Sequence, residues 1–246
     1  MEGNEKGDKF EILTPQDQEN SDKPKKMKLT TRTSCVKCGS CCLEGSPVLL
    51  KEDFPLFNST LSYDSTYTVR EGELIRSQAE GEVYESTLEL IKIKENEGRA
   101  GCMFYREDEG CMIYEQRPTQ CRQFTCWSSQ DVVTGLQEKG LTRQDLFSSV
   151  ELLLEIIGKH EEKCSYKRLS NALQQLQKGE EGAVDEVLDM LQYDTYARPF
   201  LRERFNIPAN AMDLILGRML IETINEFGFK VLQSEHEYHL EPIDGE

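Results

Sequence analysis

The chain has 246 residues, of which 37% are hydrophobic and 30% charged, and its net charge at pH 7 is −16. The length fits one large domain or two small ones, and the negative charge argues against binding nucleic acid by phosphate neutralisation. The N-terminus lacks the apolar core of a signal peptide, and no run of 18 apolar residues occurs. We therefore expect a cytoplasmic protein without membrane association.

Residues 1–34 are expected to form a disordered tail. They carry seven acidic and seven basic side chains but only four strongly apolar ones, which are too few for a core. The tail contains no cysteine before Cys35, so we expect a site built on thiols to persist without it.

The middle segment, residues 35–129, is predicted to be a cysteine-cluster metal-binding domain with short strands. It holds eight of the nine cysteines. In residues 88–94 apolar side chains mostly alternate with charged ones, as in a half-buried strand. The other segments of strand character are residues 66–69 and 74–77, and two arms, 102–105 and 111–114, around a turn at 107–110.

Residues 130–246 are predicted to form an acidic helical region. Thr142 is expected to cap its first helix, and Gly179 and Gly228 to end the second and fourth. The predicted elements are helices at 146–157, 169–176, 184–191 and 212–224, then a terminal hairpin of 229–232 and 238–240. The net charge of this region is −10, which indicates a protein partner of basic character. The predicted fold class is α+β, with a small irregular metal-organised cysteine module followed by a helical C-terminal region.

The first cysteine group lies within eight residues, CVKCGSCC at 35–42. It consists of Cys35, Cys38, Cys41 and Cys42. A two-residue gap lets two sulfurs turn toward one point, and Gly39 lets the backbone curl so that amide groups face them. Thiolates this close repel one another, and a bound cation removes that repulsion.

The second cysteine group is spread over different elements. It consists of Cys102, Cys111, Cys121 and Cys126. Pro118 suits the first turn of a short helix that carries Cys121. The N-terminus of that helix, together with Arg117 and Arg122, is expected to favour the Cys121 thiolate. An ideal helix would place Cys121 and Cys126 on different faces, so either the helix ends between them or they serve different centres.

Eight cysteines in two groups, in a reducing compartment, favour a metal centre over disulfides. Two zinc sites would use all eight thiolates, whereas one 4Fe-4S cluster needs only four. The adjacent side chains of Cys41 and Cys42 are expected to diverge, which suits a bridged multi-metal site. Together with the two-residue gaps and the charges of Arg117 and Arg122, this favours an iron–sulfur cluster over zinc. The expected cluster ligands are Cys35, Cys38, Cys41 and Cys121.

Three strings carry a family resemblance: CVKCGSCC at 35–42, CMFY at 102–105 and CMIYEQRPTQCRQFTC at 111–126. With these the chain resembles the CxxCxxCC zinc- or iron-chelating family of YkgJ-like cysteine-cluster proteins and, distantly, the flagellin lysine N-methylases. Many members have proline where this chain has Thr125. Some have a later Cys-Pro-Gly element, whereas here Cys164 is followed by Ser165 and Tyr166. The resemblance implies metal chelation without an assigned reaction.

Three functions remain open from the sequence. The favoured one is a metal-binding protein with an iron–sulfur cluster in a redox or protein-modifying role. The alternatives are a zinc-stabilised interaction module without catalysis, in which the acidic helices bind a protein partner, and a lysine N-methylase-like enzyme. No catalytic residue, phosphate loop or dinucleotide fingerprint is found. We interpret Cys164 as a small buried hydrophobe, and His236 and His239 as ordinary surface residues.

Overall fold

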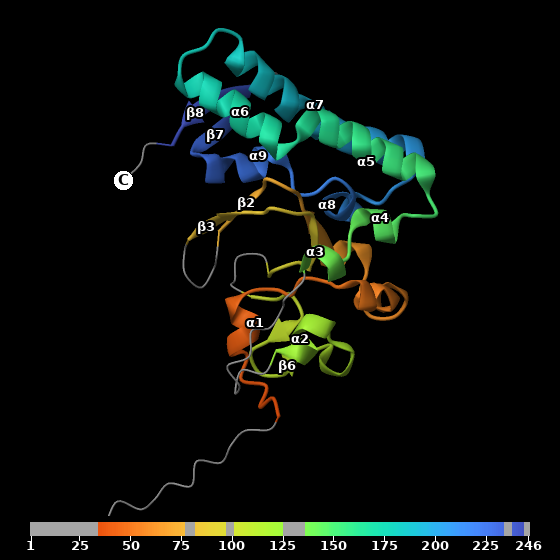
Figure 1. The fold of residues 1–246 in the computed structure, drawn as a ribbon. Helices are drawn as coiled ribbons and strands as arrows, with labels where there is room; N and C mark the ends of the chain where they lie inside the picture. The colour runs from red at the N-terminus through yellow and green to blue at the C-terminus, as the bar shows by residue number, and fades with distance from the viewer. Residues whose placement is uncertain (1–33, 77–81, 97–100, 125–135, 234–237, 244–246) are drawn as a thin grey trace, which may run out of the picture. The chain divides into compact units, whose positions relative to one another are not determined.

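The computed structural model describes residues 34–76, 82–96, 101–124, 136–233 and 238–243, all within one compact unit from Ser34 to Glu246. The predicted tail lies outside the described residues apart from Ser34. The α+β class is confirmed, because small two-stranded sheets accompany a largely helical C-terminal region (Figure 1). None of the described helices is long and apolar enough to cross a membrane.

The helices are short in the first half of the chain and long in the second. The α-helices in the described residues are α1 (Ser40–Glu44), α2 (Thr119–Gln123), α3 (Leu136–Lys139), α4 (Arg143–Leu146), α5 (Glu151–Cys164), α6 (Tyr166–Gln177), α7 (Ala183–Phe205), α8 (Met212–Ile215) and α9 (Leu220–Thr223). Single 3₁₀ turns or helices occupy Lys51–Asn58, Tyr63–Ser65, Tyr114–Gln116, Ala209–Ala211 and Ile224–Phe227.

The strands pair two by two and antiparallel. They are β1 (Thr66–Val69) with β4 (Leu90–Ile93), β2 (Leu74–Arg76) with β3 (Val83–Glu85), β5 (Tyr105–Arg106) with β6 (Gly110–Cys111), and β7 (Phe229–Gln233) with β8 (Tyr238–Pro242). The predicted strand at 66–69 and the terminal hairpin are confirmed. In β4 the side chains of Ile91 and Ile93 are buried and their neighbours half-buried, which is the predicted alternation.

The hairpin at the second cysteine group is shifted from its prediction. Only Tyr105 of the first predicted arm and Cys111 of the second lie in strands. The amide of Cys102 instead donates to the carbonyl of Cys42, at 2.8 Å, and Met103 donates to Lys94. The start of the first arm therefore pairs with other parts of the chain, while Phe104, whose carbonyl accepts from the amide of Met112 at 2.9 Å, and Tyr105 pair with the second arm.

The predicted helix at 146–157 is wrong as a single element. Thr142 caps α4 as expected, with its hydroxyl accepting from the amide of Asp145 at 3.2 Å. The helix ends at Leu146, and α5 starts only at Glu151. The intervening Phe147 turns its ring into the core, and the serines that follow favour turns over helix. Val150, predicted on the apolar face, is exposed.

The predicted helix at 212–224 is also wrong as a single element. Gly217, with φ of 78°, separates α8 from α9. A side chain at this position would put its Cβ 2.9 Å from Cδ and Nε of the buried Arg70. Arg198 also donates to the carbonyl of Gly217 at 2.9 Å. Two buried arginines thus occupy the space that a continuous helix would need.

Two apolar cores support the described residues. The first joins residues of the cysteine-containing half to α5, α7 and α8; its members include Leu49, Ile91, Ile93, Cys102, Ile157, Leu201 and Leu216. The second lies among α6, α7, α9 and β7, and includes Cys164, Leu169, Leu191, Leu220 and Phe229. Because the first core contains Cys102, packing in the helical region helps to fix one edge of the candidate site.

Candidate metal centre

Three described segments carry the cysteines of the two groups: the loop at 35–39 with α1, residues 102–111 up to and including the β5–β6 hairpin, and α2. The loop folds back through Gly39, whose φ of 81° is left-handed. A side chain at Gly39 would collide with the hydroxyl and ring of Tyr105. The predicted curl at Gly39 is therefore confirmed, and it brings the loop against the start of the hairpin.

Backbone amides face the sulfurs, as the sequence predicts. The amide of Lys37 donates to Sγ of Cys35 at 3.3 Å. The backbone of Phe104, again two residues after the cysteine, hydrogen-bonds the thiol of Cys102. The backbone of Ile113 does the same for Cys111. Such bonds stabilise a thiolate, because the donor favours the charged form of the sulfur.

Cys41 and Cys42 do not diverge as predicted, because their side chains hydrogen-bond each other. This bond lowers the pKa of Cys41 to about 6 and raises that of Cys42. Burial and the nearby thiols of the second group raise the pKa of Cys42 further. The pair therefore offers one thiolate at neutral pH and holds one proton.

Six sulfurs influence one another's ionisation, and we call these residues the thiol cluster. They are Cys35, Cys41, Cys42, Cys102, Cys111 and Cys121. Burial raises the pKa of Cys102 to about 11 and that of Cys121 to about 12. The other thiols add to the rise at Cys121, while the charge of Arg117 opposes it.

The predicted preference for a Cys121 thiolate is therefore wrong for the protein without a bound cation, since burial outweighs Arg117. Arg117 stacks on the ring of Tyr114, 4.0 Å from its centroid. Arg122 has a different role: it donates to the carbonyl of Arg117 at 2.5 Å and lies 3.7 Å from the carboxylate of Asp53. The charge of Arg117 opposes the rise in pKa at Cys111 and Cys121.

The remaining predicted ligands are placed as follows. Cys38 is exposed and its sulfur lies 3.4 Å from the hydroxyl of Ser40. Cys126 lies outside the described residues, beyond the end of α2 at Gln123. Cys164 is fully buried in the second core, away from the thiol cluster, as predicted for a small hydrophobe. His236 lies outside the described residues, and His239 is exposed in β8.

Asp53 is a part of the site that the sequence analysis missed. Its buried carboxylate accepts from the amide of Leu50 at 3.0 Å and from the amide and hydroxyl of Thr119 at 2.8 and 2.7 Å. Thr119 is the first residue of α2, so Asp53 caps the helix that carries Cys121. No local sequence pattern reveals this cap, because the two residues are 66 positions apart.

Donor chemistry at the thiol cluster fits zinc or iron, because thiolate sulfur suits both ions. Among the residues that the structure describes, however, no three His, Cys, Asp or Glu side chains already converge on one point. Within the loop at 35–42, Val36, Lys37, Cys38 and Ser40 are exposed, whereas Gly39 is buried against Tyr105.

Gly101 offers a specific test of this packing. Its φ is 99°, and a Cβ there would collide with the carbonyl oxygen of Cys42 and lie 2.8 Å from Cα of Leu43. We expect Gly101→Ala to push the two cysteine groups apart and to lower metal affinity by about 10- to 100-fold, the cost typical of changing residues that orient ligands. Metal titration of the purified variant measures the effect.

Gly158→Ala is the matched control, because a Cβ at that position in α5 would meet no atom within 4 Å. It should keep full metal affinity and stabilise the helix by about 0.5–1 kcal/mol. Unchanged metal affinity in Gly101→Ala would contradict the assignment of Gly101 to the site.

Comparisons with known proteins bear on the same segment. No curated protein and no solved structure matches the chain. Residues 34–144, somewhat less than half of the chain, match the family model CxxCxxCC, described as a putative zinc- or iron-chelating domain. This match agrees with the resemblance predicted from the cysteine strings.

Proposed function

We propose that residues 34–144 bind a metal centre through cysteine thiolates, and that this centre is an iron–sulfur cluster. The observation that carries the proposal is the gathering of six thiols from three separate segments, three of them with a backbone amide directed at the sulfur. Burial raises the pKa values of Cys102 and Cys121, and the neighbouring thiols raise them further, so a bound cation would relieve both effects.

The ligands in this proposal are the eight cysteines of the two groups. They are Cys35, Cys38, Cys41, Cys42, Cys102, Cys111, Cys121 and Cys126. We take Cys41 as the first donor, because its hydrogen bond with Cys42 lowers its pKa to about 6. The thiols with raised pKa values must lose their protons as the metal binds. A bound cluster would supply one-electron chemistry, with its potential set by the surrounding charge, hydrogen bonds and exposure.

Two features support iron over zinc. Cys35, Cys38 and Cys41 repeat at the two-residue gap that several iron–sulfur proteins use. Arg117 lies where it offsets negative charge on the thiols, as its effect on Cys111 and Cys121 shows. The sequence offered a third reason, that diverging side chains of Cys41 and Cys42 would suit a bridged multi-metal site. This reason no longer applies, because the two side chains hydrogen-bond each other.

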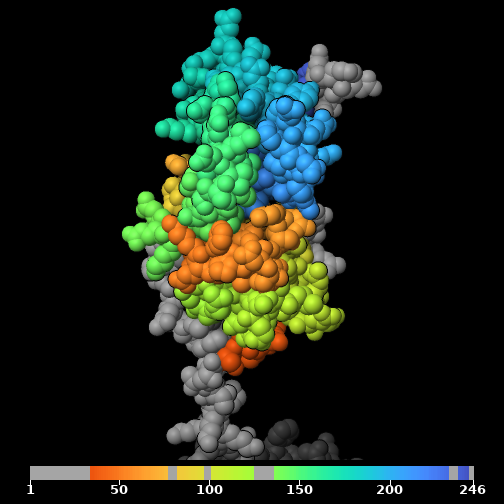
Figure 2. Space-filling model, turned by 90° about the vertical axis from the view of Figure 1, so that its right-hand side faces the viewer, coloured from red at the N-terminus to blue at the C-terminus, as the bar shows by residue number. Residues whose placement is uncertain are grey.

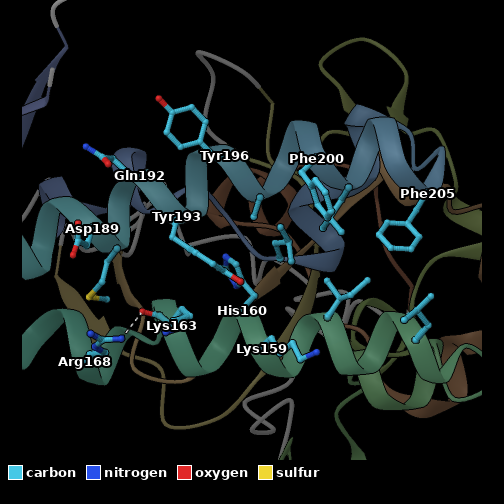
Figure 3. Close-up of a pocket in the computed structure, with 16 residues that line it drawn as sticks. Lys159, His160, Lys163, Arg168, Asp189, Gln192, Tyr193, Tyr196, Phe200 and Phe205 are labelled. Atoms are coloured by element: carbon cyan, nitrogen blue, oxygen red, sulfur yellow. Dashed lines mark hydrogen bonds between the residues drawn. The ribbon is translucent and has the colours of Figure 1, made fainter. Parts of the chain in front are cut away.

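A second candidate is a zinc-stabilised interaction module. It is favoured by a groove between α5 and α7 (green and blue in Figure 2) that is lined mostly by apolar and aromatic side chains (Figure 3), a surface that suits a protein partner. In this alternative the metal only stabilises the fold around the cysteines, as in small zinc domains. The two candidates share their ligands and differ in the metal.

Metal and sulfide analysis of protein purified without oxygen from iron-replete cells distinguishes them. We expect iron with an equal amount of acid-labile sulfide, and a brown colour. Stoichiometric zinc without sulfide would overturn the iron–sulfur assignment and support the zinc module. Protein that holds neither metal after reconstitution would overturn the proposal as a whole.

A further inference from the structure

The thiol of Cys35 has a hydrogen-bond partner from a distant part of the cysteine-containing segment. The phenol of Tyr114 hydrogen-bonds this thiol, and the amide of Lys37 donates to the same sulfur at 3.3 Å. A metal-bound thiolate can only accept hydrogen bonds, so both groups would be donors to it. Figure 2 shows the two parts of the chain side by side, with the loop at 35–42 in red-orange and residues 101–124 in yellow-green.

The ring of Tyr114 is held in place by two cations. The guanidinium carbon of Arg117 lies 4.0 Å from the centroid of the ring, and Nζ of Lys37 lies 4.9 Å from it. Such contacts attract the cation to the electron-rich face of the ring. Arg117 also donates to the carbonyl of Tyr114 at 2.6 Å, which fixes the backbone of the same residue. The hydroxyl is therefore presented to Cys35 by a ring that both neighbouring segments hold.

Lys37 also connects the cysteine loop to the β5–β6 hairpin. Its φ of 57° is left-handed, a conformation that residues with a side chain rarely adopt. Its side chain lies beside the hairpin turn, where a Cβ on Gly110 would be 3.2 Å from Cβ of Lys37. Val36, Lys37 and Cys38 are exposed, so burial does little to hold this part of the loop. The contacts with Tyr114 and Gly110 hold it instead.

We propose that Tyr114 is a positioning residue of the metal centre, whose hydroxyl holds the sulfur of Cys35 among the ligands and draws negative charge from it. The inference rests on the proposed cluster and concerns how its reduction potential is set. Hydrogen bonds to the ligand sulfurs help to set this potential, because a donor stabilises the more negative, reduced state. The phenol of Tyr114 should therefore raise the potential of the cluster.

The proposal depends on this hydrogen bond and not on the net charge around Tyr114. Lys37 and Arg117 are positive, but the adjacent Glu115 acts on Tyr114 with the opposite sign. The specific element is a single O–H donor at a ligand sulfur. Removing that hydroxyl alone is therefore the decisive change.

Tyr114→Phe removes the hydroxyl and keeps the ring with its two cation contacts. If Tyr114 served only to pack the loop, this variant would behave like the wild type. Tyr84→Phe is the matched control, because Tyr84 is exposed in β3 and its hydroxyl donates to Glu82 at 2.8 Å. Circular dichroism shows that each variant is folded.

The first measurement is the reduction potential of the full-length protein, reconstituted with iron and sulfide without oxygen. We expect Tyr114→Phe to keep its iron, and its equilibrium constant for reduction to fall by about tenfold, which is about 59 mV for a one-electron couple. Tyr84→Phe should match the wild type. Full iron content with an unchanged potential in Tyr114→Phe would overturn the proposal.

Cobalt(II) provides a second measurement, which does not depend on cluster assembly. Titrated into the metal-free chain, it gives an absorption band from charge transfer between thiolate and metal. We expect Tyr114→Phe to shift this band and to weaken cobalt affinity by about 10- to 100-fold, the loss typical of changing residues that orient ligands, with no change in Tyr84→Phe. A wild type that binds cobalt but assembles no cluster would overturn the iron–sulfur assignment, while this titration still tests Tyr114. Unchanged cobalt binding in Tyr114→Phe would overturn the role of Tyr114 and leave the proposed metal site intact.

Discussion

A chain with serine in place of Cys41 is expected to lose its metal almost completely, and Cys121→Ser is expected to do the same. Changing residues that merely orient metal ligands already lowers affinity by about 10- to 100-fold, so the loss of a ligand should exceed that range. The pKa of Cys41 is lowered by its hydrogen bond with Cys42, and Cys121 is the cysteine that α2 and its Asp53 cap hold in place. Metal content per chain after anaerobic purification is the measurement.

Cys164→Ser is the matched control for this prediction. Cys164 is as buried as any residue in the second core, and its thiol donates to the carbonyl of Met190 at 3.5 Å. A serine hydroxyl can make the same bond, and no cluster thiol is changed. We expect full metal content in Cys164→Ser; equal metal loss in all three variants would mean that the losses report general misfolding.

Metal affinity should also fall as the pH falls. The Cys41 pKa is lowered to about 6, so its thiolate is available above that pH and is protonated below it. The pKa values of Cys102 and Cys121 are raised to about 11 and 12, so these thiols release protons on binding throughout the neutral range. Affinity should therefore rise with pH at all values, and fall more steeply below about pH 6. Titrations with zinc at pH 5.5, 6.5 and 7.5 measure this slope.

Elements with a local signal were predictable from the sequence. The alternation around Ile91 and Ile93 predicted a strand, and Thr142 predicted a helix start. The cysteine strings identified the residues that gather in the thiol cluster. The strand and the helix start depend on spacings of two to four residues, whereas Cys102, Cys111 and Cys121 lie nine and ten residues apart and were recognised from the strings around them.

What could not be predicted depends on contacts between distant segments. The break at Gly217 exists because Arg70 and Arg198 fill the space beside it. The cap on α2 comes from Asp53. The backbone hydrogen bond from the amide of Cys102 to the carbonyl of Cys42 joins two motifs 60 residues apart. Each of these contacts involves a polar group whose partner is set by the tertiary fold, so the periodicity of apolar residues along the chain cannot predict it.

Asp194→Ala is expected to destabilise the helical region by about 3–5 kcal/mol, the usual cost of removing one partner from a buried charged network. Asp194 is fully buried in α7. One oxygen accepts from Nε2 of His160 at 2.8 Å and from Arg198 at 3.2 Å, and the other accepts from the amide of Leu220 at 2.8 Å. The carboxylate thus joins α5, α7 and the start of α9, and without it three buried donors lose their acceptor.

Asp189→Ala is the control, because Asp189 is an exposed residue of the same helix, and its substitution should change stability by less than about 0.5 kcal/mol. Urea unfolding followed by circular dichroism measures both variants. Equal stability of Asp194→Ala and wild type would show that the network contributes little net energy. Metal content should be preserved in both, since the thiol cluster lies apart from Asp194.

The same network should give stability a distinct pH dependence. Burial lowers the pKa of His160, so the folded protein keeps a neutral imidazole while the unfolded chain takes up a proton near pH 6.5. Stability should therefore decrease as the pH falls from about 6.5 toward the folded-state pKa.

Burial alone would raise the pKa of Asp194, but the hydrogen bond from His160 and the charge of Arg198 hold it below its ordinary value. Its contribution is present above about pH 3.8 and is lost below it. Replacing His160 with glutamine should remove the decrease that begins near pH 6.5 and keep the one below pH 4; an unchanged profile in this variant would assign the first decrease to other groups.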